Sequence, residues 1–452
     1  MNNNFCISRI RPPFSRDYYS EVLNINYNFL SDVEAKIINR IKWHYHCDAV
    51  FFLGSFRQGL KMVLDSLALD TDDEILLPNF ECPSILESFR GTKAKIDFFD
   101  LHCDFCADAD QIKSMITEKT KVVMITHYFG KSCWTAELKQ LLSDRHFILI
   151  EDCAHSLLDK DQSEIGSLGD IAIFSLGNDK PLSIGKGGIL IINNKNYVNL
   201  LEENYNNLSE QKEEVERQDF SYFVIYSLLS DPDFCYFNIP AVFPENLTVE
   251  SFEVVDIFSC PIDDIVNKYR KKLNVCNKNI VERGLNKINR LFFQQKEIKN
   301  IMPYKMSMFS KVQLLYAIAH LIDDANKKRK DNVMLYNKYL HSDNLNITQI
   351  RYNVLCHTTI EAKNMINNLR SKNIEVGLFN WSELLAQKYG VEHDIPGWAI
   401  EPARLINLPV HPFIDEKTII DICQEIRHVN VGGGGGGGAG GGGAGGGGGW
   451  GG

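Results

Sequence analysis

The chain has 452 residues, of which 44% are hydrophobic and 23% charged, which is ordinary for a soluble globular protein and long enough for two or three domains. Its net charge of −10 argues against a nucleic-acid partner, because a surface of that sign repels phosphate backbones. No apolar run is long enough for a spanning helix and no secretory signal is recognisable, so we expect a cytoplasmic protein with reduced cysteines.

Short apolar runs alternate with helical patterns from residue 49 onward. The run Ala49–Leu53 precedes apolar residues at helical spacing from Leu60 to Leu67. Helical patterns at Ala109–Ile116 and Thr135–Ser143 separate later runs, and the further strands are expected at Glu74–Leu77, Ala94–Phe99, Val122–Thr126, Phe147–Ile150, Ile171–Ser175 and Gly188–Ile192. This alternation predicts a mainly parallel sheet covered on both faces, with ligands at the carboxyl ends of its strands.

The second half of the chain is less regular. A charged helix-like stretch at Glu210–Arg217 precedes the aromatic segment Phe220–Phe243, which is either a packed helical insertion or a contact with a membrane surface or partner. A helical pattern follows from Phe309 to about Leu340. We expect an amino-terminal segment at residues 1–45 and a large domain at 46–305, with an insertion at about 196–305. A smaller α+β domain follows at 306–431, and residues 432–452 are a glycine-rich flexible tail or artefact.

Three polar clusters follow predicted strands. Ser55 and Arg57 lie in a strand-to-helix turn, where helix amide groups and a guanidinium favour a phosphate. Asp152 and His155 follow a buried strand, so Asp152 either points into the ligand crevice or caps a helix. Lys180 lies between two strands, in a loop where an isolated lysine is normally solvated.

A metal site is not expected. Cys103 and Cys106 form a close pair preceded by His102, but a zinc or redox site would require a second pair or a suitable βαβ context. We therefore interpret both cysteines as buried or loop thiols.

Order and spacing of these clusters resemble the DegT/DnrJ/EryC1/StrS family of sugar aminotransferases. The family pattern E-D-x-A-[QH], G-D-x-x-x-F-S-x-x-x-x-K-x-L and G-G is matched by Glu151–His155, Gly169-Asp170, Phe174-Ser175, Lys180–Leu182 and Gly187-Gly188. His127–Gly130 is similar to H-x-[YF]-G, and Leu408–Pro412 to L-P-x-H-P. The resemblance implies the pyridoxal-phosphate-dependent transferase fold of type I, with a large mainly parallel-sheet domain and a smaller carboxyl-terminal α+β domain.

It also implies a role for each cluster. Lys180 would carry pyridoxal 5'-phosphate as a Schiff base and move the proton, and Asp152 would hold the proton on the ring nitrogen. His155 would lie near the phenolic oxygen, while Ser55, Ser175 and amides around Arg57 would bind the phosphate. The reaction would transfer an amino group, commonly from glutamate, to a keto-sugar nucleotide in surface-polysaccharide or secondary-metabolite biosynthesis, and the enzyme would be a homodimer.

The chain departs from the family at three places. The phosphate turn S-G-T-x-A-L reads Ser55–Leu60, with Arg57 in place of threonine. Arg57 either binds the phosphate, or faces solvent or pairs with an acidic neighbour such as Glu81. The F-T-[FYW] segment reads Phe80-Glu81-Cys82, which removes the aromatic residue that stacks on the ring, and Phe80 or His127 could substitute. The N-x-R-M segment reads Met306–Phe309. These departures leave open an idle or scaffold relative of the same fold, or a sugar dehydratase, although dehydratases of the family replace the lysine with histidine.

Overall fold

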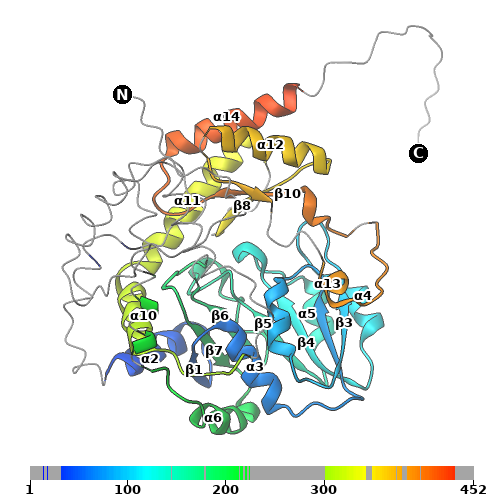
Figure 1. The fold of residues 1–452 in the computed structure, drawn as a ribbon, viewed down its shortest axis with the longest axis vertical. Coiled ribbons are helices and arrows are strands. Elements are labelled where there is room, and N and C mark those ends of the chain that lie inside the picture. The colour runs from blue at the N-terminus through cyan, green and yellow to red at the C-terminus, as the bar shows by residue number, and fades with distance from the viewer. Residues whose placement is uncertain are drawn as a thin grey trace, which may run out of the picture.

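A computed structural model describes residues 32–220 and 301–432, apart from short gaps, together with Phe14, Tyr18 and Phe223. The predicted amino-terminal segment, the aromatic segment and the 196–305 insertion lie largely outside the described residues, as does the tail after Gly432. Figure 1 shows a large sheet with helices around it, and a smaller sheet above it beside α12 and α14.

The large sheet has seven strands in the order β1-β7-β6-β5-β4-β2-β3. Strand β7 pairs antiparallel with β1 and β6, and the other neighbouring pairs are parallel. The carboxyl ends of β1 to β6 therefore lie at one edge, which confirms the predicted mainly parallel α/β fold. The strands are β1 Ala49–Leu53, β2 Glu74–Pro78, β3 Lys95–Phe99, β4 Thr120–Thr126, β5 Ile148–Asp152, β6 Ile171–Ser175 and β7 Gly188–Ile192.

Both faces of this sheet are covered, which is why its strands read as continuous apolar runs. On β1, Phe51 and Leu53 pack into one core, whereas Val50 and Phe52 pack into another, as the twofold alternation of a strand requires. The first core includes helices α3 (Phe56–Ser66), α6 (Val198–Asn206) and α13 (Leu385–Tyr389). The opposite face is covered by α2 (Val33–Tyr45), α10 (Met308–His320), α4 (Ala109–Met115) and α5 (Ala136–Ser143).

The helical pattern from Phe309 to Leu340 is two helices rather than one. Helix α10 ends at His320 and α11 spans Ile322–Leu340, because the backbone of Leu321 leaves the helical region at φ −122° and ψ −35°. Residues of α10 pack with the large sheet, whereas Val333 and Tyr336 of α11 pack with the small one. These two helices therefore connect the two cores.

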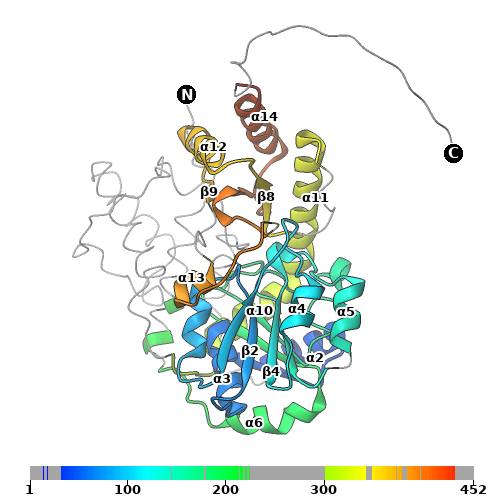
Figure 2. The same cartoon turned by 90° about the vertical axis from the view of Figure 1, so that its right-hand side faces the viewer.

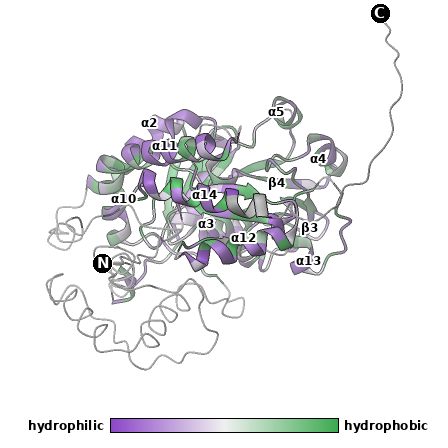
Figure 3. Cartoon of the chain, turned by 90° about the horizontal axis from the view of Figure 1, so that it is seen from above, coloured by the Kyte–Doolittle hydropathy of each residue, from purple (hydrophilic) through white to green (hydrophobic). Residues whose placement is uncertain are grey.

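The small sheet has the order β8-β10-β9 and is antiparallel. It consists of β8 (Arg351–Leu355), β10 (Leu405–Pro409) and β9 (Gly377–Leu378), and α12 (Thr359–Ser371) and α14 (Glu416–Gly432) pack beside it. Figure 3 shows hydrophilic stretches on the outer helices α2 and α12 and a hydrophobic β4. Within the described part of the chain, no helix combines the length and apolar character needed to cross a bilayer.

Helix α13 returns from the carboxyl-terminal part to the large domain, where Figure 2 shows it beside the large sheet. The amides of Leu385 and Ala386 donate to the carbonyl oxygen and Oδ1 of Asn79, at 2.8 and 3.0 Å. Asn79 Nδ2 in turn donates to Asp100 Oδ1 at 2.8 Å. The loop after β2 is thus fixed from a distant part of the sequence.

Candidate active site

Polar side chains gather where the parallel strands end. Thr126, Asp152 and Ser175 are the last residues of β4, β5 and β6. Ser55 follows β1 and caps α3, and Glu81 follows β2. The fold therefore carries most of the predicted site residues, and Glu81 in addition, to one edge of the sheet.

Asp152 is buried, with 4% of its surface exposed. Its Oδ1 accepts a hydrogen bond from the Ala154 amide at 2.8 Å, and the following residues form turns rather than an α-helix, so it is not a helix cap. Burial raises the pKa of Asp152 well above its usual range, the nearby Glu81 carboxyl raises it further, and Lys180 opposes the shift. Such a carboxyl favours a cationic ligand beside it.

Glu81 is the acidic residue that the sequence analysis left without a role in the site. It is 2% exposed, and its Oε1 and Oε2 accept hydrogen bonds from the Cys82 amide at 2.6 Å and the Thr126 hydroxyl at 2.5 Å. Burial raises its pKa, and these two bonds and Lys180 offset part of the shift. The only sequence signal was its position in the altered F-T-[FYW] segment.

Lys180 lies half-buried in the loop between β6 and β7. Its charge lowers the pKa of Glu81, Cys82 and Asp152, so Lys180 lies near all three groups. The next residue, Pro181, is held by Arg329, whose guanidinium donates to the Pro181 carbonyl oxygen. Arg329 is buried in α11, and this burial lowers its pKa to about 10. Nothing in the sequence pointed to this support.

Ser55 and Ser175 flank the start of β7. Ser55 bridges to Gly187, and Ser175 pairs with Gly188 across the β6–β7 ladder. A Cβ atom on Gly188 would lie 2.5 Å from the carbonyl carbon of Ser55, so only glycine allows this close approach. The glycine pair thus brings the first turn of α3 close to the backbone of Ser175, where backbone amides and the helix dipole favour an anion.

Arg57 lies in the first turn of α3, but its guanidinium forms an ion pair with Glu87. Glu87 belongs to the 3-10 helix Pro83–Phe89, which packs against α3. The acidic partner is therefore Glu87 and not the Glu81 considered from the sequence. A phosphate contact by the Arg57 side chain would require this ion pair to open.

The aromatic and imidazole rings considered for the site are engaged with other residues. His155 Nδ1 accepts from the Phe129 amide at 3.0 Å, and its ring stacks on Phe129 with centroids 5.6 Å apart. Phe80 is buried near Phe105 and Tyr128. His127, proposed with Phe80 as a replacement for the missing stacking residue, points instead toward Glu151.

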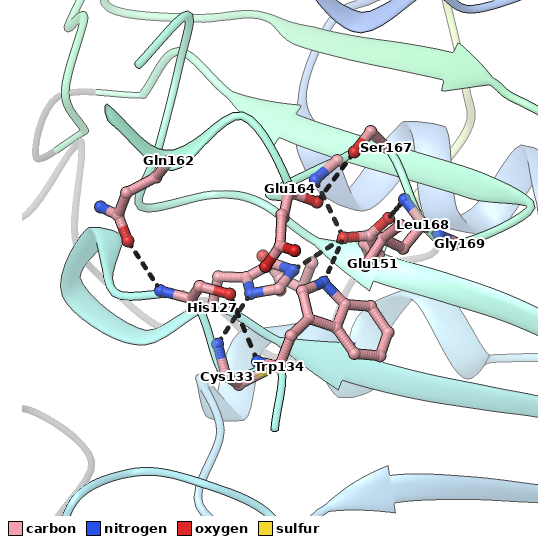
Figure 4. A network of polar contacts seen from close by, with 12 residues as sticks. His127, Cys133, Trp134, Glu151, Gln162, Glu164, Ser167, Leu168 and Gly169 are labelled. Atoms are coloured by element: carbon pink, nitrogen blue, oxygen red, sulfur yellow. Dashed lines mark hydrogen bonds and ion pairs between the residues drawn. The ribbon is translucent and has the colours of Figure 1, made fainter. Parts of the chain in front are cut away.

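Figure 4 shows how Glu151 is held. Oε2 accepts from His127 Nε2 at 2.8 Å, Trp134 Nε1 at 3.3 Å and the Gly166 amide at 2.9 Å. Oε1 accepts from the amides of Leu168 and Gly169 at 2.8 and 2.5 Å. His127 Nδ1 accepts from the Cys133 amide at 3.2 Å, so Nε2 carries the proton.

His127 and Glu151 also belong, with Cys153, to the one group of described residues whose spacing would suit a metal ion. Both ring nitrogens of His127 and both oxygens of Glu151 already have hydrogen-bond partners. Those bonds explain the cluster as a structural network, and we assign it no metal.

Comparison with solved structures defines the class of fold. An aminotransferase, TlmJ, from Streptoalloteichus hindustanus matches with a TM-score of 0.64 at 14% identity, over 94% of this chain and 99% of that one. NtdA from Bacillus subtilis, solved with bound cofactor PMP, matches with a TM-score of 0.62 at 14% identity, over 94% and 87%. The fold is that of the pyridoxal-phosphate-dependent aminotransferases.

Comparison with sequence families gives a narrower match than the fold. Residues 24–219, which carry the strand-end site, match the DegT/DnrJ/EryC1/StrS aminotransferase family. The GDP-perosamine synthase of Escherichia coli O157:H7 is 24% identical over 174 residues, which are 37% of this chain and 47% of that protein. The matching segments span less than half the length of the curated relatives.

Proposed function

We propose that the protein is a pyridoxal-phosphate-dependent aminotransferase that transfers an amino group, from glutamate or a similar donor, to a keto-sugar nucleotide. The observation that carries this proposal is that Lys180 and the buried Asp152 lie together at the carboxyl edge of the sheet, near Ser55 and Ser175. The named product of the GDP-perosamine synthase relative supports the substrate class.

The residues present fit this cofactor. Its phosphate suits the first turn of α3 with Ser55 and Ser175, since close packing at Gly188 brings the backbones of these two residues together. Its ring nitrogen suits Asp152, because a buried carboxyl with a raised pKa gains most from a cationic neighbour. When bound, the cofactor supplies an aldehyde for the amino group and a ring that accepts the electron pair.

The chain's own groups then have separate tasks. The amine of Lys180 attaches the cofactor and, once released, moves a proton at the substrate carbon. The carboxylate of Asp152 keeps the proton on the ring nitrogen. Arg329 fixes the Lys180 loop through Pro181 and so limits where the amine can reach. We further propose that the enzyme works as a homodimer in the cytoplasm; sedimentation at several concentrations tests the assembly.

Labelling and substitution of Lys180, in the loop between β6 and β7, test the proposed function. Purified protein loaded with pyridoxal phosphate is reduced with borohydride, and the labelled peptide is identified by mass spectrometry. We expect the label on Lys180, and we expect glutamate to convert the cofactor to its amino form, followed by transfer to keto-sugar nucleotides. Lys180→Ala should abolish both, lowering turnover at least about a thousandfold.

Lys186→Ala is the matched control, because Lys186 lies in the same loop but forms an ion pair with Asp219. This variant should keep the label and the turnover. A label on Lys186, or a protein that takes up no cofactor, would overturn the assignment and favour an idle relative of the family.

A further inference from the structure

Two buried carboxyls, those of Asp152 and Glu81, lie close to Lys180. Thr126 connects them: its Cα is paired in register with Asp152 on the β4–β5 ladder, and its hydroxyl donates to Glu81 Oε2 at 2.5 Å. The amide of Cys82 holds the other oxygen of Glu81 at 2.6 Å. Both hydrogen bonds are donated to Glu81, which is the arrangement that stabilises an ionised carboxylate.

The titratable groups near Glu81 come from several elements. Asp152 comes from β5, Lys180 from the loop after β6, Cys82 from the same loop as Glu81, and Tyr128 from the 3-10 helix Tyr128–Gly130. Among these groups Lys180 is the only cation. Two carboxyls opposite one ammonium leave a shortage of one positive charge, which either a bound proton or a cationic ligand can supply.

Resting on the proposed function, we propose that Glu81 acts with Asp152 as a carboxylate pair that holds the proton of the cofactor's ring nitrogen. Asp152 is the direct partner of the ring, and Glu81 is a positioning residue that acts through the charge it adds beside Asp152. Since Lys180 supplies one positive charge against two carboxyls, the pair would still favour a second cation once Lys180 holds the cofactor. A protonated ring nitrogen would supply that charge, and its proton would be retained to higher pH than Asp152 alone would allow.

The loop is built to keep Glu81 in this place. Asn79, two residues before it, binds the amides of Leu385 and Ala386, and its own amide donates to the Phe99 carbonyl oxygen at 2.7 Å. The Tyr128 hydroxyl donates to the Phe80 carbonyl oxygen. With the backbone held at Asn79 and Phe80, the Glu81 carboxyl remains close to Asp152 without a direct bond between them.

A pH titration of the bound cofactor's absorption spectrum tests the inference without measuring turnover. Removing one charge by Glu81→Gln should lower the midpoint of the spectral transition by about one pH unit or more. The control is Glu74→Gln, at the opposite end of the same strand. Glu74 Oε2 also accepts from a threonine hydroxyl, that of Thr117 at 2.6 Å, so the variant removes an equal charge from a similar bond. Its midpoint should not change.

Glu81→Asp separates charge from shape, because it keeps the carboxylate but shortens its reach to Thr126. A midpoint near that of the unmutated protein in this variant, with a shifted one in Glu81→Gln, supports the pair. If Glu81→Gln takes up no cofactor while Glu81→Asp does, the charge is needed for uptake, which also supports it. An unshifted midpoint in Glu81→Gln, or equal effects of both substitutions, overturns the inference alone. Absence of any cofactor spectrum in the unmutated protein overturns the proposed function as well.

Discussion

Glu151 and Asp152 are consecutive residues of β5, and both are buried, but their surroundings differ. Both carboxylate oxygens of Glu151 accept hydrogen bonds, from a histidine, a tryptophan and three backbone amides. Asp152 points to the other side of the strand, where one amide donor, a second carboxyl and Lys180 surround it. A carboxylate whose oxygens are satisfied stabilises the fold, whereas one left short of positive charge can bind a cation.

The largest effect is expected from changing Asp152, the neighbour to which we assign a function. Asp152→Asn should leave cofactor bound through Ser55, Ser175 and Lys180, yet lower the rate of amino transfer by at least about a hundredfold. An amide cannot hold the proton on the ring nitrogen as a carboxylate does. Single-turnover kinetics with glutamate measures this loss, and an undiminished rate would remove Asp152 from the catalytic groups.

Glu151→Gln tests the structural role of the other neighbour. Its side-chain NH2 group would face N–H groups that now donate to an oxygen, so we expect a loss of about 3 kcal/mol in the free energy of unfolding. Urea denaturation of the cofactor-free protein measures it, with Asp152→Asn as the matched carboxyl-to-amide control. Equal losses in the two variants would contradict the distinction between the neighbouring residues.

Arg57 tests a weaker interaction at the phosphate end of the site. If its guanidinium leaves Glu87 to bind the phosphate, Arg57→Ala should weaken cofactor binding about ten- to hundredfold, and Arg57→Lys should restore part of it. Equilibrium dialysis of both variants measures the affinity. Unchanged affinity in each would leave the ion pair with Glu87 as the whole role of Arg57, with the serines and backbone amides holding the phosphate.

The smallest effect concerns pH and the cofactor-free protein. Because the folded-state pKa values of Asp152 and Glu81 are raised, their contribution to stability is present below the unfolded value of about 4 and is lost as pH rises through the folded values. Glu81→Gln should therefore lose less stability than the unmutated protein between pH 5 and pH 8. Thermal unfolding across that range provides the measurement; a difference independent of pH would contradict the shifts.

The strands were predictable because burial on both faces makes each of them an unbroken apolar run, and all seven began or ended within two residues of the expected positions. The positions of Asp152, Ser175 and Lys180 followed from those strand ends. The direction in which each side chain points did not follow from the strand ends. His127 was considered for ring stacking, but the Cys133 amide and Glu151 orient it, and both contacts depend on how distant segments pack.

Glu81 illustrates the same limit from the other side. Its replacement of a family threonine was visible, but only the pairing of β4 with β5 brings Thr126, and hence Glu81, next to Asp152. The exchange of Glu81 for Glu87 as the partner of Arg57 has a similar cause, since the packing of the 3-10 helix Pro83–Phe89 against α3 decides which acid is in reach.

The hydrogen bonds from α13 to Asn79 have a consequence for the order of assembly during translation. They join residues separated by up to 307 positions in the chain, and they fix the loop that bears Glu81. All large-sheet strands are synthesised long before Ala386 emerges from the ribosome, so a nascent chain can form its central sheet while the loop after β2 still lacks this anchor. The loop that bears Glu81 therefore gains this anchor late, from the carboxyl-terminal third of the polypeptide.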